Sequence, residues 1–137
     1  MSKKIIFSLI AVVSLVAVTI GVSASSKSNK EVSDNNIYLF YGEGCVYCEN
    51  LMGYLGSLPD EIQSKFNLVE YEVWNDQDNN NLMNKVGSHF NDEITGVPYL
   101  VIGKETFNGY AESYNEDILN AINNLESNYY DVLEEIK

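Results

Sequence analysis

Arginine is absent from this 137-residue sequence, and its eight lysines face 20 aspartate and glutamate residues, giving a formal net charge of −12 at pH 7. Such an acidic surface argues against nucleic acids and anionic lipid headgroups as partners, and it suits a solvated, exported protein. Histidine is almost absent too. Because a tetrahedral zinc site needs four ligands and only His89 could join two cysteines, we expect no metal, and we interpret His89 as a helix surface residue.

Charged residues are also missing from residues 5–22, which follow Lys3 and Lys4 and are apolar except for serine, threonine and glycine. This pattern is typical of a signal peptide with a cleavage site after Ala24, or of an uncleaved N-terminal membrane anchor, in residues 1–24. Because the lysines stay inside, both alternatives place the remainder outside the cytoplasm, either secreted or anchored to the cell membrane.

A polar spacer without periodicity is expected in residues 25–36, and one folded domain in residues 37–137, which we expect to be monomeric. Within the domain, short apolar or alternating runs predict strands, and apolar residues at helical spacing predict helices. The predicted strands are residues 37–41, 67–74, 98–102 and 106–108, and the predicted helices are residues 45–58, the second part of 75–90, and 114–136.

This order of elements predicts an α/β sandwich with a mixed four-stranded sheet. A right-handed crossover makes the first two strands parallel, so the hairpin must pair against the first strand. The expected strand order is 67–74, 37–41, 98–102, 106–108, with 67–74 at an edge. Strand 37–41 is then central, and Cys45 follows its carboxyl end, where such sheets place their chemistry.

The only two cysteines form the motif Cys45-Val46-Tyr47-Cys48 at the start of the first predicted helix. Unpaired N–H groups and the positive end of the helix dipole favour a thiolate at Cys45, which we interpret as the accessible, attacking sulfur. Cys48 lies one turn deeper, where it can resolve a mixed disulfide. A static disulfide is the alternative, but a bridge across so short a loop removes little chain entropy.

These residues resemble the thioredoxin-like family. The resemblance rests on the Cys-Val-Tyr-Cys motif after a strand, on Gly96-Val97-Pro98-Tyr99-Leu100 opening the hairpin, and on Phe107-Asn108-Gly109-Tyr110 closing it. It implies a three-layer thioredoxin-like sandwich with helices on both faces of the sheet. It also implies a cis Pro98 facing the cysteines, and Val97 as the residue whose backbone pairs with a substrate chain. Tyr47 is a further candidate for substrate binding.

The sequence departs from the family at positions that bear on mechanism. Leu39 stands where thioredoxins have a buried aspartate, and Val46-Tyr47 matches neither the Gly-Pro of thioredoxins nor the Pro-His of DsbA-type oxidases. Glu43 and Glu49 flank the cysteines, and their charge should oppose a thiolate. Glu72 could approach Cys48 from the neighbouring strand, but its place in an alternating strand favours an exposed edge carboxylate.

We therefore predict an extracytoplasmic thiol-disulfide oxidoreductase whose only redox group is the Cys45–Cys48 disulfide, with no added cofactor. The expected partners are exported cysteine-containing proteins or peptides and a membrane or extracellular redox protein. Small Gram-positive thioredoxin-like proteins, some labelled bacteriocin transport accessory proteins, suggest an alternative: a factor for export or disulfide maturation of a bacteriocin-like peptide. A non-catalytic peptide-binding module is the other alternative.

Overall fold

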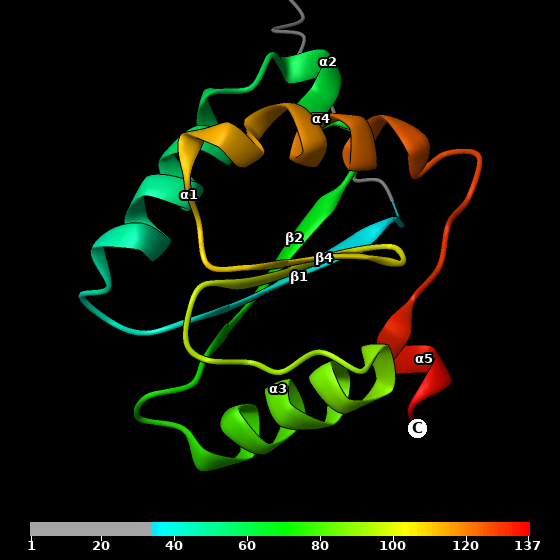
Figure 1. Cartoon of the computed structure of the whole chain (residues 1–137). Coiled ribbons are helices and arrows are strands. Elements are labelled where there is room, and N and C mark those ends of the chain that lie inside the picture. The colour runs from blue at the N-terminus through cyan, green and yellow to red at the C-terminus, as the bar shows by residue number, and fades with distance from the viewer. Residues whose placement is uncertain (1–33) are drawn as a thin grey trace, which may run out of the picture.

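The computed structural model describes residues 34–137 (Figure 1). The signal peptide or anchor expected in residues 1–24, and most of the expected spacer, lie outside the described residues. None of the helices in residues 34–137 is long and apolar enough to cross a membrane. The strands are β1 (Asn36–Tyr41), β2 (Asn67–Glu72), β3 (Tyr99–Ile102) and β4 (Glu105–Asn108). The helices are α1 (Val46–Ser57), α2 (Asp60–Gln63), α3 (Gln77–Phe90), the 3-10 helix η1 (Glu112–Tyr114), α4 (Asn115–Asn124) and α5 (Val132–Glu135).

The four strands form one mixed sheet in the order β2-β1-β3-β4. β1 is parallel to β2 and antiparallel to β3, and β3 and β4 form an antiparallel hairpin. The predicted α/β class, strand order and edge position of β2 are therefore confirmed. In the register, Phe40 of β1 lies between Tyr71 of β2 and Tyr99 of β3, and the three rings pack together.

Successive residues of β1 contribute to two separate hydrophobic clusters. Ile37 and Leu39 belong to the cluster that contains buried residues of α1 and α4, whereas Tyr38 and Phe40 belong to the cluster that contains Met83 of α3. This split follows from strand geometry, because adjacent side chains point to opposite faces of a sheet. Figure 1 shows the result, with α1, α2 and α4 on one side of the sheet and α3 and α5 on the other.

The long helix predicted for residues 114–136 is wrong. The structure instead has η1, α4, a connection at residues 125–131, and the short helix α5. Leu125 packs in the cluster with α1 and α4, whereas Val132 packs in the cluster on the other side of the sheet. One straight helix cannot cover both faces. The chain therefore leaves α4, passes the end of the sheet and begins α5 beneath it (Figure 1).

Asp131 fixes the position where the chain reaches this second face. Its carboxylate accepts hydrogen bonds from the Tyr38 hydroxyl at 2.7 Å, the Tyr129 hydroxyl at 3.0 Å and the Leu133 backbone N–H at 2.9 Å. Asp131 is thus the N-cap of α5 and also a tie to the central strand. Burial tends to raise the pKa of Asp131, but the hydrogen bonds from Tyr38, Tyr129 and Asn36 lower it below its usual value of 3.8.

Replacing Asp131 by alanine should lower the free energy of unfolding by about 2 kcal/mol, because a cap and a charged acceptor for Tyr38 are both lost. The stabilisation should be complete above pH 3.8 and fade as the pH falls through the lower folded-state pKa, so the difference from wild type should shrink in acid. Urea unfolding at several pH values measures this. Glu126→Ala, which removes the same charge from an exposed position, is the control, and an equal loss in both variants would contradict the prediction.

Candidate functional site

A tight turn connects the central strand to the helix that carries the cysteines. The backbone N–H of Cys45 donates to the carbonyl of Gly42 at 3.1 Å, and Gly44 has a φ of 77°. This left-handed conformation favours glycine because it has no β carbon. The turn reverses the chain at the carboxyl end of β1 and places Cys45 at the N-cap of α1.

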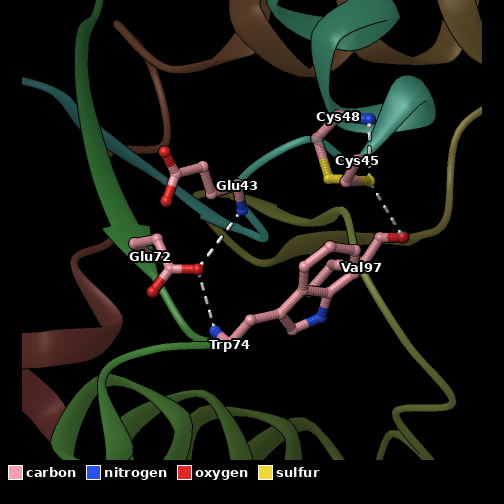
Figure 2. The surroundings of a disulfide bond; sticks show 6 residues. All are labelled: Glu43, Cys45, Cys48, Glu72, Trp74 and Val97. Carbon is pink, nitrogen blue, oxygen red and sulfur yellow. Dashed lines mark hydrogen bonds between the residues drawn. A yellow bond between two sulfur atoms is a disulfide. The ribbon is translucent and has the colours of Figure 1, made fainter.

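Cys45 and Cys48 form a disulfide, with their α carbons 5.2 Å apart (Figure 2). The Cys45 Sγ accepts a hydrogen bond from the backbone N–H of Cys48 at 3.2 Å, so the sulfur itself caps the helix. Donors at a helix start stabilise negative charge, and in the reduced protein this N–H would favour a thiolate at Cys45. The geometry therefore gives the two sulfurs different environments.

Burial also separates the two cysteines, although less than the sequence suggested. Cys45 is 7% exposed and Cys48 1% exposed, while the two residues between them, Val46 and Tyr47, are 64% and 63% exposed. The expectation of an open Cys45 is corrected here, because its side chain packs inward against the loop that contains Val97. Cys45 nevertheless remains the more accessible of the two sulfurs.

The loop that precedes β3 lies against the disulfide. The Cys45 Sγ is 3.9 Å from the carbonyl oxygen of Val97, and Figure 2 shows the two groups facing each other. The Val97–Pro98 peptide bond is cis, as the family resemblance implies. The carbonyl of Pro98 accepts a hydrogen bond from Gly109 at 2.8 Å, and the hydroxyl of the next residue, Tyr99, donates to Asp92 at 2.7 Å. Both ends of the loop are therefore held in place beside the sulfurs.

Glu72, at the end of β2, connects two loops at this edge of the sheet. One carboxylate oxygen accepts backbone N–H groups of Glu43 at 3.2 Å and Trp74 at 3.0 Å, and the other accepts that of Asn75 at 2.8 Å (Figure 2). Within residues 34–137 its hydrogen bonds go to these loops, not to a cysteine. Burial tends to raise the pKa of Glu72, but the bonds from Asn75, Glu43 and Trp74 lower it below its usual value. The carboxylate therefore acts here as a structural acceptor.

Trp74 is a part of the site that the sequence analysis missed. Its indole lies directly on Gly42, where an added β carbon would collide with the ring, and it is 59% exposed. It comes from the loop after β2, so it covers the turn leading to Cys45 from a distant part of the chain. The available signal was its position just past the carboxyl end of the strand beside β1. As the only tryptophan in the sequence, it can report on this site by fluorescence.

The remaining predicted residues occupy the surroundings of the disulfide. Glu43 lies in the turn before Cys45 and Glu49 in the first turn of α1, and both are exposed. Leu39 is fully buried in β1, opposite Leu100 of β3. His89 lies in α3, where its Nε2 is 2.6 Å from the Tyr130 hydroxyl.

Comparisons with protein-family models, with curated proteins and with solved structures gave no match to this chain. The functional argument therefore depends on the site itself. Two cysteines at this spacing, joined as a disulfide at a helix start, are compatible with redox chemistry in which a disulfide is exchanged for two thiols.

Replacing Glu72 by glutamine should loosen the two loops, because an amide has one acceptor oxygen where the carboxylate has two. Trp74 fluorescence should become more accessible to acrylamide, and backbone hydrogen exchange at Glu43 and Asn75 should accelerate several-fold. Acidification of the wild type should have the same effect as the pH falls below 4.5 and through the lowered pKa of Glu72.

Glu70→Gln is the matched control, because this exposed residue lies two positions earlier on the same strand. If Glu70→Gln and Glu72→Gln change the quenching of Trp74 equally, the effect comes from lost charge and not from the bonds that Glu72 accepts.

Proposed function

We propose that the protein is an extracytoplasmic thiol-disulfide oxidoreductase with a thioredoxin-like arrangement, acting on exported cysteine-containing proteins or peptides. The observation that carries this proposal is the position of the Cys45 sulfur. It accepts the Cys48 backbone N–H at the start of α1 and lies 3.9 Å from the carbonyl of Val97, beside a cis Pro98. The apolar segment in residues 5–22 supports the location outside the cytoplasm.

The reaction is a reversible exchange of two electrons between two dithiol/disulfide pairs. In the oxidised protein, a substrate thiolate attacks the Cys45 sulfur, the Cys45–Cys48 bond breaks, and Cys48 leaves as a thiolate that takes up a proton. A second substrate thiolate then attacks the substrate sulfur of the mixed disulfide and releases Cys45. The substrate is oxidised to a disulfide and the protein is reduced to a dithiol. A second dithiol/disulfide protein must restore the starting state.

In the opposite direction, the Cys45 thiolate attacks a substrate disulfide and Cys48 releases the reduced substrate. The burial of Cys48, at 1% exposure, supports its assignment as the resolving residue, because an external disulfide reaches Cys45 more easily. Cys48 is also close enough to resolve the adduct, since the two residues already form a disulfide in the structure.

The segment Val97–Pro98 supplies a surface beside the reacting sulfur. Val97 is half-buried, and Pro98 is buried at the start of β3. A substrate chain lying along Val97 would bring its cysteine to the Cys45 sulfur, and main-chain hydrogen bonds would give affinity without requiring a particular side chain.

Replacing either cysteine should have a different consequence. Cys48→Ala should accumulate covalent adducts between Cys45 and natural partners, because attack proceeds and release does not, whereas Cys45→Ala should accumulate few. The measurement is non-reducing electrophoresis of cells that express the full chain, after quenching with a thiol-alkylating reagent. Stable adducts on Cys45→Ala and not on Cys48→Ala would reverse the two assigned roles.

Turnover separates this function from a binding module that carries an incidental disulfide. The wild-type protein should accelerate disulfide exchange in a model protein substrate, and Cys45→Ala should reduce the rate to the uncatalysed background while retaining the wild-type circular dichroism spectrum. A wild-type rate equal to background would refute the proposed catalytic function.

A further inference from the structure

A groove of about 550 Å³ lies between α1 and the segment that joins β4 to α4. Its α1 wall includes Tyr47, Asn50 and Gly53, and its opposite wall includes Tyr110 and Glu112. Figure 1 shows that the start of α1 and the chain leading into α4 lie on the same side of the sheet. Neither wall contributes to the disulfide, so this groove is separate from the Val97–Pro98 surface.

Tyrosine hydroxyls hold the two walls of the groove together. Tyr54 of α1 donates to the backbone carbonyl of Asn115 at 2.7 Å, and Tyr110 donates to the side-chain oxygen of the same residue at 2.8 Å. The two rings are stacked with their centroids 6.4 Å apart. The groove is therefore a formed feature with aromatic and polar walls.

The groove begins at the redox site. Tyr47 lies between the two cysteines in sequence, is 63% exposed and lines the groove. A substrate bonded through its cysteine to Cys45 can extend past Tyr47 and enter the space between the walls. The groove is thus positioned to contact residues that flank the reacting cysteine of a substrate.

Every charged side chain near the groove is negative. Glu49 lies in the first turn of α1, Glu112 lines the groove, and Glu116 and Asp117 lie in the first turn of α4. No lysine occurs in α1 or between residues 109 and 124. The lysines among residues 34–137 belong to other segments: Lys65, Lys85, Lys104 and Lys137. The one ion pair found among the described residues is between Lys137 and Glu134, so no described cation neutralises these carboxylates.

We propose that this groove selects substrates with lysine or arginine next to the reacting cysteine. A cationic side chain in the groove would lie between tyrosine rings, which attract cations through their faces, and would approach carboxylates that have no partner in the protein. The inference rests on the proposed redox function, because that function brings the substrate cysteine to Cys45. It adds the chemical class of substrate, a basic cysteine-containing peptide.

The first experiment compares three synthetic disulfide peptides that are identical except for the residues flanking the reacting cysteine, which are lysine, glutamine or glutamate. The reduced full chain should exchange with the lysine peptide about tenfold faster than with the glutamine peptide at low salt, and more slowly with the glutamate peptide. The difference should decrease as ionic strength rises. Equal rates for the three peptides would overturn the inference while leaving the proposed redox function intact.

Net charge alone would attract a lysine peptide to any protein of charge −12, so variants must separate the groove from the overall field. Gly53 and Gly56 are both exposed residues of α1, and an added β carbon meets nothing within 4 Å at either position. Only Gly53 lines the groove. Gly53→Lys and Gly56→Lys therefore make the same substitution in the same helix, with the same change in net charge.

Gly53→Lys should reduce the preference for the lysine peptide over the glutamine peptide at least about threefold more than Gly56→Lys does. Equal reductions in the two variants would show that overall charge, and not the groove, determines the preference, and would overturn the inference.

Binding provides a readout that does not depend on exchange. The same peptides, with serine in place of cysteine, can be titrated into the full chain while NMR follows the amide signals of Gly53 and Tyr110. The lysine peptide should shift these signals at lower concentration than the glutamine peptide. If neither peptide shifts them, the groove is not the binding site. If they shift but no peptide exchanges disulfides, the proposed redox function fails and the groove preference stands.

Discussion

Residues 37–40 of β1 are buried on both sides, and this one constraint determines the rest of the arrangement. A strand with two buried faces needs helices above and below it, so the chain must leave β1, build α1 on one face, and later place α3 and α5 on the other. The crossover that leads to β2 also starts at the carboxyl end of β1. The cysteines occupy the start of α1, where the chain first turns back over the sheet.

Several segments that are distant in sequence meet at this end of the sheet. The turn before Cys45 follows β1, the loop with Trp74 follows β2, and the loop with Val97 precedes β3. Glu72 binds the first two of these loops through backbone N–H groups, and Pro98 is joined to Gly109 after β4. The surroundings of the disulfide are therefore fixed mainly by backbone hydrogen bonds, which tolerate many side chains and leave the exposed ones free to determine substrate preference.

Local patterns were sufficient for the features that depend on one element. Continuous apolar runs identified β1 and β3 as buried strands, alternation placed β2 at the edge, and the sequence of elements then gave the strand order. The predicted helix at 114–136 failed because helical spacing does not show which face of the sheet a residue covers, and Leu125 and Val132 cover opposite faces. The contact of Trp74 with Gly42 and the groove at Tyr47 were not predictable, because each depends on how separate elements pack.

The electrostatics of the site balance one favourable interaction for a thiolate against several unfavourable ones. The backbone N–H of Cys48, at 3.2 Å, stabilises negative charge on the Cys45 sulfur. Against it stand the exposed carboxylates of Glu43 and Glu49, with no lysine in the turn or in α1. Glu72 does not relieve this repulsion by taking a proton, because its hydrogen bonds hold its pKa below the usual value. Since a disulfide carries no charge, surplus negative charge penalises the reduced, thiolate form and not the oxidised one. The same carboxylates would be neutralised by a basic substrate, so a cationic peptide would both bind at the site and ease formation of the thiolate that attacks it.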